Sequence, residues 1–317
     1  MSNQNTKSFL IQSTIGASMM AGVLLVILNP NYPIFKTTTN YAVQIMFAYL
    51  FASIGFLLLK KPGLLFTGFA CTAALCLFLQ QSSNKDLVFP KINGEQKISV
   101  AQFNMSAASD DVNASIKSII EADADVISLQ EITPDWQPIL KTKLAKKYPY
   151  HSLVYRTEDF LGIALYSRFP FTQLDTVYCE KTPNLIAKVE VDRQPIYLAA
   201  TYFYPELNDS DLDRIDKHKS ILKTYFQQVH DPVINFGEFN QVQWTSFIKE
   251  YKNEMNLLDS RRFPFFDNPT DHIFFSKDFE CIDFKTITNA YTNHLGICGE
   301  YQIKMNLANV EGANRKF

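Results

Sequence analysis

The sequence VINFGEFNQVQW, residues 233–244, places polar side chains directly after an apolar strand. Its first four residues are mostly apolar and predict a buried strand, and Gly237 permits a sharp turn. Glu238 and Asn240 follow two positions apart, so an extended chain presents both side chains on one face. A carboxylate and an amide at the end of a strand suit proton abstraction and phosphate binding, but they also suit an ordinary turn. The remainder of the chain decides between these alternatives.

Strand and helix patterns alternate on both sides of this stretch, and the central part of the chain is rich in short strands separated by Pro, Asn and Asp. Alternation indicates a layered α/β protein, whereas the central runs suit antiparallel strands. We therefore predict two packed sheets with helices outside. The expected strands cover 97–105, 125–131, 152–156, 162–169, 185–191, 196–203, 233–236 and 271–276, with a hairpin near 281–303. The expected helices cover about 110–122, a segment after Pro134, 210–229 and 244–255.

Residues 1–85 and 86–317 differ sharply in charge. The first segment has five basic residues and no Asp or Glu, hence +5, whereas the second has 25 basic and 32 acidic residues, hence −7. The first segment also contains three apolar runs, 9–28, 42–59 and 63–79, each near the ~20 residues that cross a bilayer. We predict a membrane anchor of three transmembrane helices in 1–85 and one soluble domain in 86–317.

Lysines near the apolar runs predict the orientation of the anchor. Lys7 and the Lys60/Lys61 pair lie on one side of the membrane, whereas Lys36 and Lys85 lie on the other. Because lysine and arginine are retained in the cytoplasm, we expect a cytoplasmic amino terminus and an extracytoplasmic carboxyl-terminal domain. A cleavable signal peptide is the alternative for the first run, but two more apolar runs follow it and no small-residue cleavage site ends it.

Three smaller features leave alternatives open. Cys281 and Cys298 form a disulfide if their strands are neighbours, or else they remain buried free thiols. The loop RRFPFFDNP, residues 261–269, presents its phenylalanines to a partner or to lipid, or packs them inward. Basic residues either form a nucleic-acid patch or a solvated surface, and the net charge of −7 disfavours nucleic acid. The candidate basic residues are Lys141, Lys143, Lys146, Lys147, Arg261 and Arg262.

Polar residues recur at the ends of several predicted strands. They are Asn104 after VAQF, Gln130 and Glu131 after VISL, Glu238 and Asn240 after INFG, and the segments TDHIFF (270–275) and YTNHLG (291–296). Each of them separately is typical of a turn or of a structural ion pair. Their order along the chain carries more information than any one of them.

With these motifs the chain resembles the endonuclease/exonuclease/phosphatase superfamily. The resemblance covers about residues 97–304, with AQFNM, DVISLQEI, GIALYSRFP, ATYFYP, NFGEFNQVQW, DHIFF and TNHLG in the family's order. It implies a four-layer α/β/β/α sandwich. Three apolar runs before such a domain resemble a membrane-anchored bacterial subgroup, which implies a multi-pass protein of the bacterial inner membrane with a periplasmic domain.

The resemblance also implies a metal site. Glu131 corresponds to the family's ligand of a divalent cation, normally Mg²⁺, and Asn104 corresponds to a residue that helps to form this site. Such a hard cation takes oxygen ligands and keeps several waters.

The remaining site residues are assigned by the same resemblance. Glu238 corresponds to the acid that orients or deprotonates the attacking water, and Asn240 corresponds to a phosphate-binding residue. His294 corresponds to the residue that stabilises charge on the phosphoryl oxygens. Tyr202 stands where many members have a histidine and others a tyrosine.

Two positions depart from the family's pattern. Glu238 stands where the family has Asp, so its carboxylate reaches about one methylene too far for a site that tolerates roughly half an ångström. Asn293 stands where the family has Asp directly before the histidine, so a partner that supports the charge of His294 is neutral. We therefore expect a catalytically impaired member that serves binding or assembly in a membrane complex. The alternative is an active Mg²⁺-dependent phosphodiesterase or phosphatase that acts on a phospholipid, a nucleotide or a nucleic acid.

Overall fold

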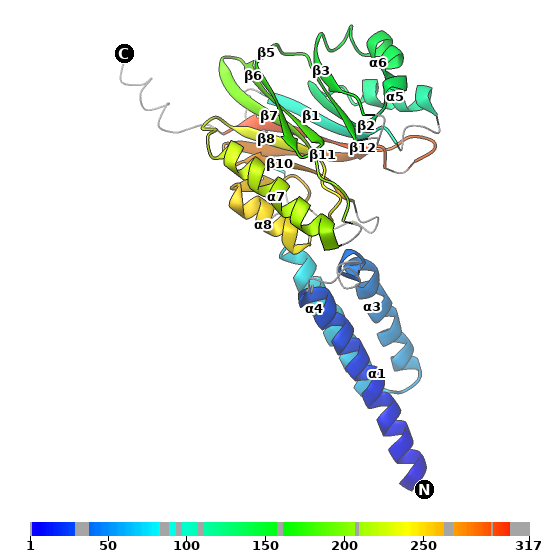
Figure 1. Cartoon of the computed structure of the whole chain (residues 1–317). Helices are drawn as coiled ribbons and strands as arrows, with labels where there is room; N and C mark the ends of the chain where they lie inside the picture. Colours follow the sequence, from blue (N-terminus) through cyan, green and yellow to red (C-terminus); the bar gives the residue numbers. More distant parts are fainter. Residues whose placement is uncertain are drawn as a thin grey trace.

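A helical bundle precedes a two-sheet α/β domain in the computed structural model of the chain (Figure 1). The structure describes residues 2–28, 38–82, 89–92, 97–106, 111–156, 161–206, 209–262, 269–292 and 294–304. The bundle contains α1 (Ser2–Leu28), α3 (Ala42–Leu58) and α4 (Pro62–Gln80). The helices of the domain are α5 (Val112–Glu121), the 3₁₀ turn η1 (Pro134–Trp136), α6 (Gln137–Lys143), α7 (Asp209–Phe226) and α8 (Ser246–Glu254).

The domain contains two six-stranded sheets. The first sheet has the order β11 (Phe279–Ile287), β12 (Gly296–Ile303), β1 (Lys97–Asn104), β2 (Val126–Ile132), β4 (Gly162–Ser167), β3 (Tyr150–Val154). The second sheet has the order β5 (Phe171–Cys179), β6 (Thr182–Val191), β7 (Gln194–Tyr202), β8 (Val233–Glu238), β10 (Asp271–Ser276), β9 (Leu257–Asp259). The pairs β1–β2 and β7–β8 are parallel, so their carboxyl ends meet at one edge of each sheet.

Three apolar clusters set the order of the layers. One lies between the sheets and includes Val100 and Leu165 of the first sheet with Leu198 and Phe236 of the second. A second fills the space between the first sheet and helices α5 and α6. A third fills the space between the second sheet and helices α7 and α8. The predicted α/β fold of two packed sheets with helices outside is therefore confirmed.

Most elements agree with the sequence within a few residues, but two strands were not predicted. These are β5 (Phe171–Cys179) and β9 (Leu257–Asp259). Strand β5 is an edge strand with mostly exposed or half-exposed residues, so it lacks the apolar alternation of a buried strand. Strand β9 has three residues, too few for any periodic signal.

The number of predicted transmembrane helices is corrected by the structure. Among the described residues, Thr6–Leu28 and Pro62–Gln80 are long and apolar enough to cross a membrane, by length and composition. Helix α3 is apolar but has only 17 residues. It ends at Leu58 because Lys60 adopts a left-handed conformation with φ 55°, which closes the helix before α4 begins.

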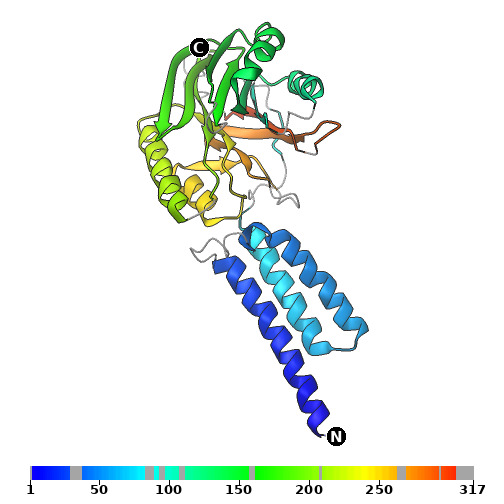
Figure 2. The ribbon, with the colours of Figure 1, turned by 45° about the vertical axis from the view of Figure 1, so that its right-hand side comes forward.

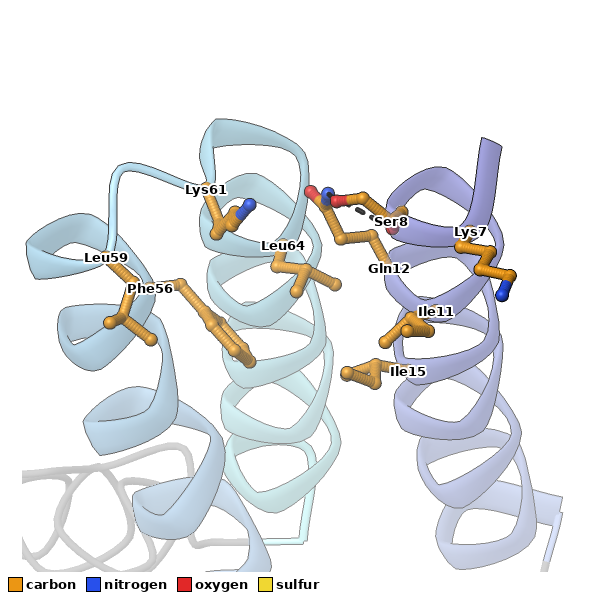
Figure 3. Close-up of a pocket in the computed structure, with 9 residues that line it drawn as sticks. All are labelled: Lys7, Ser8, Ile11, Gln12, Ile15, Phe56, Leu59, Lys61 and Leu64. Carbon is orange, nitrogen blue, oxygen red and sulfur yellow. Dashed lines mark hydrogen bonds between the residues drawn. The ribbon is translucent and has the colours of Figure 1, made fainter. Parts of the chain in front are cut away.

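The bundle packs end-on against the domain, with α1 and α4 both directed toward it (Figure 2). Lys7 on α1 and Lys61, directly before α4, both line a groove of about 480 Å³ with mostly apolar walls at the opposite end of the bundle (Figure 3). Both lysines therefore lie at the end of the bundle away from the domain. Many large apolar side chains of the bundle are exposed, among them Phe9, Phe51 and Phe66 at 69%, 67% and 71%.

Several alternatives left open by the sequence are settled by position. Cys281 and Cys298 are buried free thiols, because Cys281 lies opposite Tyr301 and Cys298 opposite Lys285, which puts them out of register on neighbouring strands. Arg261 and Arg262 are buried at 1% and 5% exposure, so these two residues do not contribute to the alternative of a basic nucleic-acid patch. The phenylalanines of this loop, Phe263, Phe265 and Phe266, lie outside the described residues, so the choice between docking and inward packing stays open.

Candidate active site

Glu131 is presented to the edge of the first sheet by a β-bulge. The register between β2 and β4 shifts between Gln130 and Ile132, and Glu131 adopts a left-handed conformation with φ 59°. A bulge re-aims one side chain out of the regular alternation, and backbone strain of this kind is typical of functional positions. Asn104 Nδ2 donates to Glu131 Oε1 at 2.8 Å, and the Tyr202 hydroxyl donates to the same oxygen at 3.4 Å.

Gln130 connects the two sheets beside Glu131. Its Nε2 donates to the Thr201 carbonyl at 2.8 Å, and its Oε1 accepts from the backbone N–H of Glu238 at 2.7 Å. Gly237 leaves room for this bridge, because a Cβ there would come within 1.8 Å of Thr201 O and 2.6 Å of Gln130 Nε2. The side chain of Gln130 is fully buried. The carboxyl ends of β2, β7 and β8 are therefore held together by one amide.

Glu238 ends β8 and is 7% exposed. Its Oε1 accepts from the backbone N–H of Asn240 at 3.1 Å, and Asn240 adopts a left-handed conformation with φ 52° that turns the chain back toward the carboxylate. Burial, together with the negative charge of Asp271, its partner opposite on β10, raises the pKa of Glu238 to about 7. A carboxylate with such a pKa exchanges a proton readily near neutral pH.

His294 is paired with a buried aspartate on β10. Its Nε2 lies 2.8 Å from Asp271 Oδ2, and Arg261 lies on the other side of this carboxylate, with Nη2 3.2 Å from Oδ1. Burial alone would lower the pKa of His294, but the hydrogen bond and charge of Asp271 outweigh it and the pKa is raised. The pKa of Asp271 is lowered in spite of its burial, through its bonds to His294 and the nearby charge of Arg261.

This pair changes the expectation for Asn293. Sequence reasoning assigned the partner of His294 to position 293 and inferred that the partner had become neutral. Position 293 lies outside the described residues, and a charged carboxylate already supports the imidazole from position 271. A buried, hydrogen-bonded aspartate holds a histidine in one orientation and favours its protonated form. One of the two reasons for expecting impaired catalysis is therefore removed.

The expected site residues that the structure describes lie at one edge of the sandwich. Hydrogen bonds link Asn104, Tyr202 and Glu131 into one group. Glu238, Asn240 and, through Asp271, His294 make up a second group, and Gln130 joins it to the strand that carries Glu131. Asn240 Nδ2 donates to the Phe203 carbonyl at 2.8 Å, which orients its side chain beside β7.

Sequence reasoning missed the roles of Asp271 and Gln130. TDHIFF was singled out as a polar segment, but its aspartate was given no role because its nearest sequence neighbours offered no partner. The signal was its position as first residue of a strand, where an antiparallel neighbour of β8 must place it opposite Glu238. The sequence signal for Gln130 was weaker: an amide side chain within a strand predicted to be buried, directly before the carboxylate of Glu131.

The group around Glu131 is compatible with one hard divalent cation. The carboxylate of Glu131 is half-buried at the site, and the Asn104 amide group and the Tyr202 hydroxyl lie beside it. Mg²⁺ in proteins commonly binds through one or two carboxylates while it keeps several waters. Within the described part of the chain, no group of three or more His, Cys, Asp or Glu side chains is placed to hold a metal ion. Glu131 is thus the residue that fits a weakly held, water-rich cation, with Asn104 orienting its carboxylate.

Comparisons with known proteins agree with this fold. The model of the endonuclease/exonuclease/phosphatase family matches residues 101–290. No curated protein matches the sequence. Among solved structures, the human Nocturnin catalytic domain with bound sulfate anion is 16% identical, with a TM-score of 0.53 over 66% of this chain and 95% of that one.

Two bacterial structures are similar to the same degree. An endonuclease/exonuclease/phosphatase from Beutenbergia cavernae is 16% identical and gives a TM-score of 0.52 over 66% of this chain and 72% of its own. An endonuclease/exonuclease/phosphatase family protein from Bacteroides thetaiotaomicron is 13% identical and gives 0.51 over 67% of this chain and 100% of its own. At these identities the likeness concerns the fold.

Proposed function

Because the chain belongs to the endonuclease/exonuclease/phosphatase family, we propose that it is a metal-dependent phosphoric ester hydrolase anchored in a membrane. The observation that carries this proposal is the Asp271–His294 pair, a charge-supported imidazole beside the buried carboxylate of Glu238. A structural role requires neither a histidine with a raised pKa nor a neighbouring carboxylate whose pKa is near 7. An acid and a base with shifted pKa values that lie side by side are typical of general acid–base catalysis.

The mechanism uses these groups in distinct roles. Glu238 in its ionised form accepts a proton from the attacking water, whose oxygen forms the new bond to phosphorus. The bond from phosphorus to the leaving oxygen breaks, and that oxygen is protonated by solvent. His294 in its protonated form donates to a phosphoryl oxygen, where negative charge accumulates in the transition state. Asn240 binds a second phosphoryl oxygen. Mg²⁺ held by Glu131 would supply further charge stabilisation when bound.

The second candidate is a domain that binds or assembles without turnover. It is favoured by Glu238, whose longer side chain stands where the family has Asp and is hydrogen-bonded back to its own loop. The Asp271–His294 pair serves phosphate binding as well as turnover, whereas a buried carboxylate beside it with a pKa of about 7 serves proton transfer and argues for hydrolysis. We therefore place hydrolysis first and binding within a membrane complex second.

Membrane anchoring is part of the proposal. Two apolar helices of sufficient length and the exposed phenylalanines of the bundle support it, because such surfaces in water would cause aggregation. Lys7 and Lys61 at the end of the bundle away from the domain support a cytoplasmic position for that end. The domain then lies on the extracytoplasmic side, which is the periplasm if the membrane is a bacterial inner membrane.

The test is hydrolysis of a soluble ester by the full-length protein in detergent micelles. We expect Mg²⁺-dependent cleavage of bis-p-nitrophenyl phosphate or p-nitrophenyl phosphate, reduced by about 10² or more in Glu131→Gln and in His294→Gln. The matched control is Gln227→Glu on the far side of α7, which leaves the rate unchanged. Failure of the intact protein to cleave either ester, with cleavage restored by Glu238→Asp, would establish the non-catalytic alternative.

A further inference from the structure

The domain is joined to the bundle by a buried tryptophan. Trp244 is 1% exposed, and its Nε1 donates to the Thr39 carbonyl at 2.7 Å. The Thr39 hydroxyl in turn donates to the Val26 carbonyl of α1 at 3.1 Å. Trp244 and Val242 belong to the same apolar cluster as Val26 and the end of α4. The contact is therefore a packed joint with a hydrogen bond at its centre.

A second contact beside Trp244 makes this joint rigid. Lys249 on α8 places its ammonium 4.3 Å from the centre of the Phe78 ring near the end of α4. Lys252, one turn further on, lies 3.5 Å from the Ser82 carbonyl just beyond α4. Two elements of the domain, the loop with Trp244 and helix α8, thus hold two elements of the bundle. Such a joint resists the rotation that a single flexible linker would permit.

The joint continues directly into the candidate active site. Trp244 follows Glu238 by six residues, so their Cα atoms are at most about 20 Å apart even in a fully extended chain. The intervening loop is fixed at Asn240 by its bond to Phe203 and at Gln241, whose carbonyl lies 2.8 Å from His272 Nε2. The edge of the sandwich with the site residues is therefore held at the domain end of the bundle (Figures 1 and 2).

In the membrane anchor proposed above, the surface of the membrane on the side of the domain falls at this joint. Tyr41, directly before α3, is 51% exposed, and the apolar segments of α1 and α4 end at Leu28 and Gln80 on the same side. Tyrosine and tryptophan are enriched at the boundary between lipid and water. The head-group layer is about 5–7 Å thick on each side of the hydrocarbon core, so a site held within about 20 Å of its boundary lies at the head groups or in the water directly next to them.

The charge of the domain bears on the type of ester. A long polyanion such as nucleic acid is gripped by many basic side chains, whereas residues 86–317 carry a net charge of −7. A lipid presents a single phosphate that its own membrane already holds in position, so no extended basic surface is needed to bind it.

From the joint, the interfacial level and the charge, we infer that the ester hydrolysed at this site is carried by a lipid of the same membrane. The inference rests on the proposed function and deepens it. The water oxygen bonds to the lipid phosphorus, one phosphorus–oxygen ester bond breaks, and the released oxygen takes up a proton. The joint holds Glu238 and His294 close to the membrane surface, so a lipid of that membrane is already near the site, whereas a soluble substrate must diffuse to it.

The test compares a lipid with a soluble ester for the full-length protein. Vesicles of a total bacterial polar lipid extract with ³²P-labelled phosphate serve as the lipid probe, and bis-p-nitrophenyl phosphate in the same vesicles serves as the soluble one. The joint variants are Trp244→Phe, which removes the bond to Thr39, and the double variant Phe78→Ala with Lys249→Ala, which lies outside the site. The matched control is Lys277→Ala, an exposed lysine after β10.

The expected result is formation of a labelled hydrolysis product by the intact protein, either released or retained in the membrane, with a fall of about tenfold in lipid turnover in the joint variants and an unchanged rate on the soluble ester. If the intact protein cleaves the soluble ester and forms no labelled product from the vesicle lipids, in the water or in the membrane, the lipid inference is wrong and the proposed function stands. If both rates fall together in the joint variants, the joint positions the catalytic loop only, which also overturns the inference. If neither ester is cleaved, the proposed function is wrong, and the lipid inference that rests on it is wrong as well.

Discussion

Neutralising Asp271 tests the pair on which the proposed chemistry depends. Asp271 and Arg261 form an ion pair in which each side chain is only 2% exposed. Asp271→Asn removes the charged carboxylate of this buried pair. Breaking a buried ion pair costs about 3–5 kcal/mol, which corresponds to about 10 °C in melting temperature for a domain of this size. His294 loses the charge that raises its pKa, so a smaller fraction is protonated at neutral pH. We expect turnover to fall by about 10² to 10⁴, by analogy with the neutralised aspartate of a serine-protease triad.

The pH dependence of this effect has a defined sign. The pKa of Asp271 is lowered in the folded protein, so its stabilisation is present above about pH 4 and is lost as the pH falls through its folded pKa. The pKa of His294 is raised, so its stabilisation is complete below about pH 6.5 and is lost as the pH rises through its folded pKa. The loss of stability in Asp271→Asn is therefore largest between about pH 4 and 6.5.

The assay is thermal unfolding in parallel with ester hydrolysis, both from pH 4 to 9 and well below the melting temperature of the variant. The matched control is Asp283→Asn, the same change on the exposed face of β11, which leaves both curves unchanged. The alkaline limb of the rate profile should move to lower pH in Asp271→Asn. An unmoved limb, or a rate within threefold of the intact protein, would refute the assigned role of the pair.

Three further predictions follow from single side chains. Glu238→Gln removes the acidic limb near pH 7 from the rate profile. Without Mg²⁺ it also abolishes the decline in unfolding free energy between about pH 4.5 and 7, because a raised carboxyl pKa stabilises the fold only while protonated. Gly237→Ala forces a Cβ against the Thr201 carbonyl and lowers the melting temperature by about 6 °C or more, whereas Gly55→Ala, with no atom near its added Cβ, has no such effect. Glu131→Gln weakens Mg²⁺ binding by about tenfold or more in isothermal titration calorimetry, and unchanged affinity would place the cation elsewhere.

The sequence predicts the sheets well because their strands are buried. Strands β1, β2, β7, β8 and β10 carry continuous apolar runs bounded by polar residues, which is the pattern of strands covered on both faces. Edge strand β5 carries no such pattern, since its exposed residues are under no requirement to be apolar. Prediction of strands therefore follows the apolar pattern: the edge strands β5 and β9 were missed, whereas the edge strands β3 and β11 were predicted.

The residues of the candidate site could be predicted from the sequence, but the contacts between them, above all the Asp271–His294 pair, could not. Strand-end positions single out Glu131 and Glu238 as polar residues that converge where parallel strands share an edge, and the family resemblance assigns the roles of these two residues and of His294. The partner of His294 depends on the antiparallel pairing of β10 with β8, a contact between segments more than thirty residues apart. The bulge that exposes Glu131 likewise arises from a register shift against β4, which no local pattern in β2 reveals. The predicted apolar run 42–59 is one residue longer than α3, which ends at Leu58 before the left-handed Lys60 and has 17 residues.

The pairing of β1 with β12 has a consequence for biosynthesis. Lys97 at the start of β1 lies opposite Gln302 near the end of β12. The first strand of the domain therefore cannot complete its pairing on this side until the last strand has been synthesised. While the ribosome or a translocation channel still holds the carboxyl-terminal segment, the first sheet keeps an open edge between β1 and solvent. Chaperones that cover such an edge are thus needed until about residue 303 emerges, and a truncation shortly before Gly296 should leave the whole domain prone to degradation rather than merely its last hairpin.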